Sequence, residues 1–149
     1  MTRKMGAKVH PINSRKEAIK FLGGKPKQKL GPNTWLENQD GNPAVVLHWT
    51  PVVTWKTCQE CAPDHRYCGD ALILNSGGYE TPTTKHRINA YLPTGWNLYQ
   101  ENYVWYVQHW SDGNGWDSKD HRWIFEDGMR IYPLTGHVAG AVNVATGLR

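Results

Sequence analysis

Short runs of β-branched and aromatic residues recur along the 149-residue chain, separated by polar or glycine-containing stretches. Such runs are typical of β-strands. Two of the intervening stretches, 101–102 and 126–128, are short enough to join their flanking runs as β-hairpins. Since strands and helices do not alternate, the pattern favours antiparallel strands over a doubly wound nucleotide-binding fold. The predicted strands cover residues 44–49, 52–55, 71–74, 96–100, 103–108, 122–125 and 129–132.

Two segments have the signals of short helices instead. In segment 81–92 the apolar residues follow helical spacing, and Thr81 with Pro82 forms a suitable start. Near the N-terminus, Ser14 and Glu17 have the spacing of a capping box, and a glycine pair follows as a stop signal. Each helix is too short to persist without packing against the rest of the protein.

These elements predict an α+β fold that is mostly β. We expect an antiparallel meander or a small barrel-like sheet, with one short helix after a Gly-Gly turn and another in a basic N-terminal arm. The arm spans 1–30, and the β-rich core domain spans 31–133. The tail, 134–149, is rich in glycine, alanine and valine, and is either disordered or adds an edge strand.

The composition indicates an aromatic core and argues against a disordered protein and a membrane-spanning one. Eight Trp and seven Tyr argue against global disorder. No run of 18 apolar residues is present, which excludes a membrane-spanning helix. The charged N-terminus precedes no apolar stretch and therefore does not resemble a secretory signal. We expect a cytoplasmic protein with no membrane partner.

Charge is divided unevenly along the chain. Residues 1–30 hold nine basic side chains and one acidic one, giving +8, whereas 31–149 hold eight basic and twelve acidic ones, giving −4. A basic arm on a mildly acidic body is typical of proteins that bind polyanions. The alternatives are a solubilising tail or an arm that docks on the acidic body. Segment 25–29 is predicted to be an extended linker. The candidate phosphate contacts in the arm are Arg3, Lys4, Lys8, Arg15, Lys16, Lys20, Lys25, Lys27 and Lys29.

All three cysteines and one histidine fall within eleven residues, as Cys58, Cys61, His65 and Cys68. Three thiolates and an imidazole suit tetrahedral Zn²⁺ in a closed structural site, which leaves no open position for a substrate. A zinc ion bound there would hold together the long loop of a hairpin. The alternatives are a disulfide or free thiols, although an odd cysteine count without a secretion signal disfavours disulfides.

The Gly77-Gly78 turn before the 81–92 helix is a candidate phosphate-binding site. Backbone N–H groups at a helix N-terminus attract phosphate, and hydroxyl and basic side chains follow in the helix. The Walker A spacing is absent, so we do not expect nucleotide hydrolysis. The alternative is an ordinary glycine turn with a capped helix. The candidate contacts are Gly77, Gly78, Thr83, Thr84, Lys85 and Arg87.

Signals for catalysis are sparse. No nucleophile elbow, zinc-protease motif or zinc-deaminase pattern is present, and the chain is not predicted to be an enzyme. Three histidines, His48, His109 and His121, are candidates to meet in space, but packed or surface positions are the commoner outcome. Several aromatic residues are candidates to stack on nucleic-acid bases, although most are expected in the core. These are Trp96, Tyr99, Trp105, Trp110 and Trp116.

Three segments within 45–131 carry a resemblance to a family of small bacteriophage proteins: 47–50 (LHWT), 74–89 (LNSGGYETPTTKHRIN) and 125–129 (FEDGM). The resemblance implies a viral protein in the host cytoplasm, in which 58–68 is an insertion, and it carries no activity with it. We therefore predict a non-enzymatic protein that binds DNA or RNA through its basic arm and phosphate-binding turn. One alternative is an anti-defence protein that sequesters a nucleotide signal. Another is an inhibitor that binds a host protein.

Overall fold

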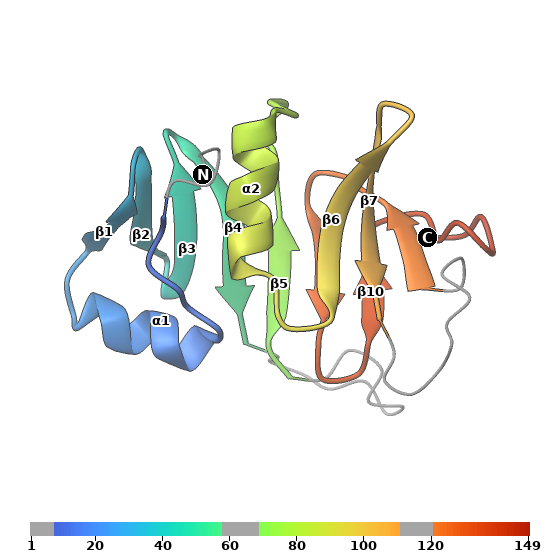
Figure 1. Ribbon diagram of the computed structural model, residues 1–149. Coiled ribbons are helices and arrows are strands. Elements are labelled where there is room, and N and C mark those ends of the chain that lie inside the picture. Colours follow the sequence, from blue (N-terminus) through green and yellow to red (C-terminus); the bar gives the residue numbers. More distant parts are fainter. Residues whose placement is uncertain (1–7, 58–68, 111–120) are drawn as a thin grey trace.

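The computed structural model describes residues 8–57, 69–110 and 121–149, which form two antiparallel sheets and two helices (Figure 1). The larger sheet has seven strands in the order β1-β2-β3-β4-β5-β9-β10, and the smaller has the order β6-β7-β8. The mostly β fold is confirmed, as two open sheets and not as a closed barrel. The elements are α1 (Arg15–Leu22), β1 (Lys27–Gly31), β2 (Thr34–Gln39), β3 (Asn42–Leu47), β4 (Thr50–Lys56), β5 (Ala71–Leu74), α2 (Pro82–Tyr91), β6 (Trp96–Glu101), β7 (Val104–His109), β8 (Arg122–Ile124), β9 (Met129–Tyr132) and β10 (His137–Ala139).

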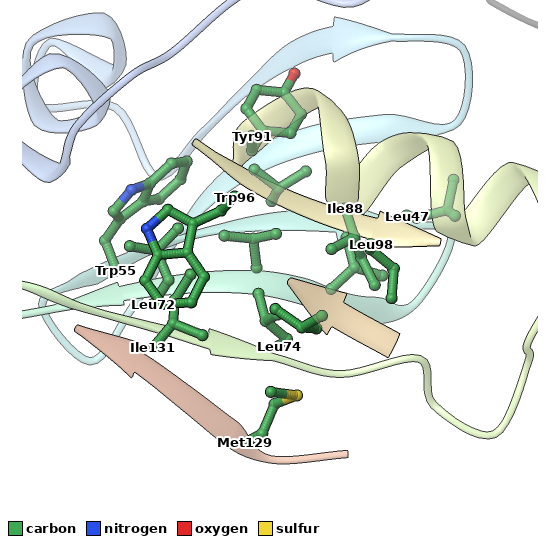
Figure 2. Close-up of a cluster of buried hydrophobic side chains, with 14 of the residues drawn as sticks. Leu47, Trp55, Leu72, Leu74, Ile88, Tyr91, Trp96, Leu98, Met129 and Ile131 are labelled. Atoms are coloured by element: carbon green, nitrogen blue, oxygen red, sulfur yellow. The ribbon is translucent and has the colours of Figure 1, made fainter. Parts of the chain in front are cut away.

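One hydrophobic core lies between the larger sheet and the elements that cover it. Figure 2 shows Ile88 of α2 and Leu98 of β6 beside Leu74 of β5. Trp55 and Tyr91 meet edge to face with ring centroids 6.2 Å apart, a geometry that aromatic pairs favour. The side chains of α2 and the small sheet thus bury one face of the larger sheet, as the aromatic composition predicts.

The N-terminal segment is packed against this core from residue 8 onward. Ser14 Oγ accepts a 3.1 Å hydrogen bond from Glu17 N, which confirms the predicted helix start. Ala18 is fully buried, as is Ile12 before the helix. The predicted linker at 25–29 is wrong, because most of it belongs to β1, the edge strand of the larger sheet. The backbone N–H of His10 donates to Leu30 O, so the chain before α1 also lies along this edge.

The two predicted hairpins have different outcomes. The hairpin of β6 and β7 forms, but its turn is Asn102-Tyr103, one residue later than predicted, and both residues have positive φ, as a two-residue type I′ turn requires. The hairpin across 126–128 is wrong. Its first strand, β8, pairs with β7, whereas β9 pairs with β5, so the segment crosses from one sheet to the other.

The C-terminal tail connects both sheets. Its first part forms β10 at the edge of the larger sheet, which is the edge-strand alternative. Farther on, Ile124 N donates to Val142 O and Val144 N donates to Arg122 O, so the tail also lies along β8. No helix within the described ranges 8–57, 69–110 and 121–149 is long and apolar enough to cross a membrane.

Candidate functional site

The β3–β4 turn presents an aromatic side chain to solvent. Leu47 pairs with Thr50, so the turn consists of His48 and Trp49, and His48 has a φ of 56°. His48 N donates a 2.8 Å hydrogen bond to Asn33 O in the β1–β2 turn, which fixes the backbone here. Trp49 is 93% exposed although its ring is a large apolar surface.

A pocket of about 570 Å³ lies between this turn and the N-terminus of α2. Buried Leu47 and Val52 contribute its apolar lining. Its rim includes Trp49 and Tyr79, which is 67% exposed. The remaining lining residues are His48 and five hydroxyl-bearing residues: Thr50, Ser76, Thr81, Thr83 and Thr84. None of the described lining residues is an aspartate, glutamate, lysine or arginine.

The Gly77-Gly78 turn supports one side of this pocket. Both glycines have positive φ, and a Cβ on Gly77 would lie 2.6 Å from Thr50 Oγ1, so the turn needs glycine and approaches β4 closely. Gly77 N donates to Asn75 Oδ1 and Gly78 N donates to Ser76 Oγ. The N–H groups proposed to hold phosphate are therefore engaged within the turn.

A second hollow, of about 510 Å³, adjoins the first one. The two share His48 and Trp49, and the second continues across the outward face of β2 to Trp35 and Lys27. The Nζ atoms of Lys27 and Lys29 lie 4.9 and 5.8 Å from the centre of the Trp35 ring, within the range of cation–π contacts. The Trp35 ring and lysine ammonium groups thus share one face of the sheet with the carboxylate of Glu37, which also lines this hollow.

Basic residues of the N-terminal segment gather around α1 and β1, at one end of the larger sheet (Figure 1). Arg15 is half-buried and its guanidinium donates to Gly41 O at 3.3 Å. Arg3 and Lys4 lie outside the described residues. The other candidate phosphate contacts of this segment are exposed: Lys8, Lys16, Lys20, Lys25, Lys27 and Lys29.

Arg87 faces the interior of the protein and not the pocket. It is 4% exposed, its Nε donates to Thr34 Oγ1 at 2.8 Å, and a second guanidinium nitrogen lies 2.7 Å from His86 Nδ1. Burial lowers the pKa of the Arg87 guanidinium. The structure therefore gives Arg87 a role in fastening α2 to β2, whereas Lys85 is half-buried on the same helix.

Two other groups predicted from the sequence are the zinc site and the three histidines. Cys58, Cys61, His65 and Cys68 lie outside the described residues, and within the described ranges no group of three metal-ligating side chains comes together. Of the three histidines, His109 and His121 meet with ring centroids 6.3 Å apart, and His48 lies at the pocket instead. The three therefore do not form one cluster.

The aromatic residues singled out from sequence are mostly not the exposed ones. Trp96 and Trp105 are in the core as expected, Tyr99 is half-buried, Trp110 is 45% exposed and Trp116 lies outside the described residues. The sequence predicts a strand through Trp49 because this residue continues a β-branched run, whereas β3 ends at Leu47. Neither His48 nor Trp49 is a residue that tight turns favour. Pro51, two residues later, is the signal in the sequence that indicates a break nearby.

The Kyanoviridae Gp96 protein family matches residues 32–132, about two thirds of the chain. The match includes the β3–β4 turn, the Gly77-Gly78 turn and α2, and it supports the resemblance to small bacteriophage proteins. No curated protein and no solved structure matches the chain.

Proposed function

The chain belongs to the Kyanoviridae Gp96 protein family, and from that premise we propose that it binds single-stranded nucleic acid in the cytoplasm of an infected host. In this proposal the protein carries out no reaction. The chemistry required is of two kinds, aromatic faces on which unpaired bases stack and cations that neutralise the phosphate backbone.

One observation carries the proposal: Trp49 is 93% exposed where two hollows adjoin. Stacking is independent of base identity because every base has a π-face. Trp35 lies along the second hollow and Tyr79 along the first, so each of the two hollows that meet at Trp49 has a further aromatic side chain. A single exposed tryptophan is ordinary, whereas aromatic residues grouped around hollows favour a ligand.

The charge of the adjoining end of the sheet supports the same function. Residues 8–30 hold seven basic side chains and one acidic one, a net charge of +6. Of these residues, Lys27 lines the second hollow and the Lys29 Nζ lies 5.8 Å from the centre of the Trp35 ring, whereas the others gather around α1 and β1 at the same end of the sheet. A strand stacked on Trp49 and Trp35 would bring its phosphates toward these lysines. Such binding should weaken steeply with salt.

The test is fluorescence anisotropy with labelled single-stranded DNA and RNA and with a duplex, at about 50 mM and about 200 mM salt. We expect single strands to bind in preference to the duplex. Trp49→Ala should weaken binding by roughly 5- to 150-fold, the range of about 1–3 kcal/mol for one stacked base. Tyr103→Ala is the matched control, because Tyr103 is also 93% exposed in a two-residue turn, at the tip of the β6–β7 hairpin.

The contribution of charge is tested separately. Lys27→Gln with Lys29→Gln should reduce the slope of log affinity against log salt by about 1.4, since each phosphate contact on a single strand contributes about 0.7. Lys56→Gln, at the far end of β4 from the Trp49 turn, should leave the slope unchanged. The absence of binding to any oligonucleotide at low salt would overturn the proposal.

Sequestration of a free nucleotide is the second candidate function. The 570 Å³ pocket favours it, since this volume lies within the usual range for small-molecule sites. Affinity for a mononucleotide that equals the affinity for an oligonucleotide, with little dependence on salt, would favour this alternative.

A further inference from the structure

We propose that the pocket between the β3–β4 turn and α2 receives one unpaired nucleobase, turned out of the bound strand onto Trp49. The inference rests on the proposed function and specifies what that site recognises. Its ligand is the neutral, planar base, and the sugar–phosphate backbone stays outside, along the second hollow.

The lining of the pocket suits a base better than a phosphate. As described above, its described lining residues include no aspartate, glutamate, lysine or arginine. The N–H groups of Gly77 and Gly78 donate to side chains within their own turn. An anion in the pocket would therefore meet no lysine or arginine side chain and no N–H group of the glycine turn to compensate its desolvation. A base brings a π-face for Trp49, an apolar body for Leu47 and Val52, and polar edges for hydroxyl groups.

The hydroxyl groups of the pocket divide into two sets. Thr81 Oγ1 accepts from Thr84 N, and the two hydroxyl oxygens lie 3.1 Å apart, so this pair serves mainly as the cap of α2. Thr50 and Thr83 line the pocket from β4 and from the first turn of α2. A hydroxyl both donates and accepts, so these two can satisfy the edges of different bases. The pocket would thus bind a base without strict selection.

The walls of the pocket are held in place before any ligand arrives. The Trp49 turn is fixed by the pairing of Leu47 with Thr50 and by the hydrogen bond from His48 N to Asn33 O. The opposite side rests on the glycine turn, whose Ser76 is 1% exposed. A rigid platform lowers the entropic cost of ordering the site on binding.

The lysines are placed to hold the backbone while the base is in the pocket. Lys27 lines the second hollow, which meets the first at His48 and Trp49. A strand that follows the second hollow therefore reaches the pocket directly. This arrangement predicts that the affinity for a short strand depends on the base at one position far more than on the bases at neighbouring positions.

The test is an abasic scan of a short single-stranded oligonucleotide, in which each position in turn lacks its base. We expect one position at which loss of the base weakens binding by roughly 5- to 150-fold, and smaller effects elsewhere. Thr83→Phe fills the pocket from an exposed position, and should lower the affinity for the intact strand to that for the sensitive abasic strand. Ala90→Phe, at an exposed position near the other end of α2, is the control. Thermal unfolding of both variants verifies the fold.

The outcomes separate the two proposals. A loss of affinity at one abasic position that is seen with the native protein and not with Thr83→Phe supports the base pocket. Equal losses at all positions, or an intact position-dependent loss in a folded Thr83→Phe protein, would overturn the pocket and leave single-strand binding standing. No binding by any strand would overturn both.

Discussion

Asp127 Oδ1 accepts two hydrogen bonds from Ser76, one from the backbone N–H at 2.7 Å and one from the hydroxyl at 2.8 Å. The two residues are 51 positions apart, and the contact ties the crossover between the two sheets to the glycine turn beside the pocket. Ser76 Oγ also accepts from Gly78 N. One carboxylate therefore fixes a turn that no helix or sheet ladder holds.

Removing this carboxylate should destabilise the protein and loosen the pocket. We expect Asp127→Ala to lower the free energy of unfolding by about 1–3 kcal/mol, because it leaves the nearly buried Ser76 N–H and hydroxyl without their acceptor. Asp127→Asn keeps one acceptor oxygen and should cost less. Urea titration measures both. Glu80→Ala, an exposed carboxylate before α2, is the control, and an equal loss in that variant would contradict the assignment.

The two glycines of the turn should differ in their tolerance of a side chain. Gly77→Ala adds a Cβ 2.6 Å from Thr50 Oγ1 at a φ of 65°, and we expect a loss of roughly 1–3 kcal/mol. Gly78→Ala has a positive φ of 84° but no atom within 4 Å of the added Cβ, so it should cost less. Thermal denaturation compares them. Thr50→Ala should recover part of the loss in Gly77→Ala and none in Gly78→Ala.

Local signals in the sequence were sufficient for the helices. Ser14 with Glu17, and Thr81 with Pro82, act within a single turn of chain, and both starts lie where the spacing predicts them. Helix caps depend on neighbouring residues alone, so they can be read without knowledge of the fold.

Features that depend on distant parts of the chain could not be read in this way. Segment 27–31 is polar and basic, and it is a strand because β2 supplies its hydrogen-bond partners. The 126–128 segment has the composition of a hairpin turn, yet tertiary pairing places its two flanking strands in different sheets. Likewise, Arg87 looks like a surface cation, and only the fold places Thr34 within 2.8 Å of it.

Stability should depend on the protonation of His86. Burial, followed by the positive charge of Arg87, lowers the pKa of His86 from its ordinary 6.5. Around this pH the folded state therefore binds fewer protons than the unfolded state. The free energy of unfolding should fall as the pH decreases through 6.5 toward the pKa of His86 in the folded protein. His86→Gln should reduce the loss of unfolding free energy between about pH 7 and about pH 5. An unchanged pH profile would contradict this, and His48→Gln at an exposed position is the control.

The zinc site predicted from Cys58, Cys61, His65 and Cys68 remains a prediction, and it can be tested directly. The described chain on either side is paired, with Lys56 opposite Ala71, so a metal in this loop would close the β4–β5 hairpin. We expect native mass spectrometry to find one Zn²⁺ per chain. Cys58→Ser should remove the metal and lower the melting temperature, and acid should release it because the ligands must be deprotonated. Full stability in chelator would rule the site out.

Arg87 and Lys85 are two cations on the same helix. Substitution of Arg87 should lower the stability of the protein, whereas substitution of Lys85 should weaken its binding to nucleic acid. Arg87→Ala leaves the buried Thr34 Oγ1 and the half-buried His86 Nδ1 without the guanidinium, and we expect a loss of about 1.5–3 kcal/mol in the free energy of unfolding. Arg87→Lys should recover little, because an ammonium group cannot reproduce the planar fork of the guanidinium. Lys85→Ala should leave the unfolding free energy unchanged and reduce the salt slope of oligonucleotide binding by about 0.7, as expected for one lost phosphate contact. Chemical denaturation and anisotropy on the same preparations distinguish the two effects. If folded Arg87→Ala protein showed the reduced salt slope and Lys85→Ala did not, the assignment of the two roles would be reversed.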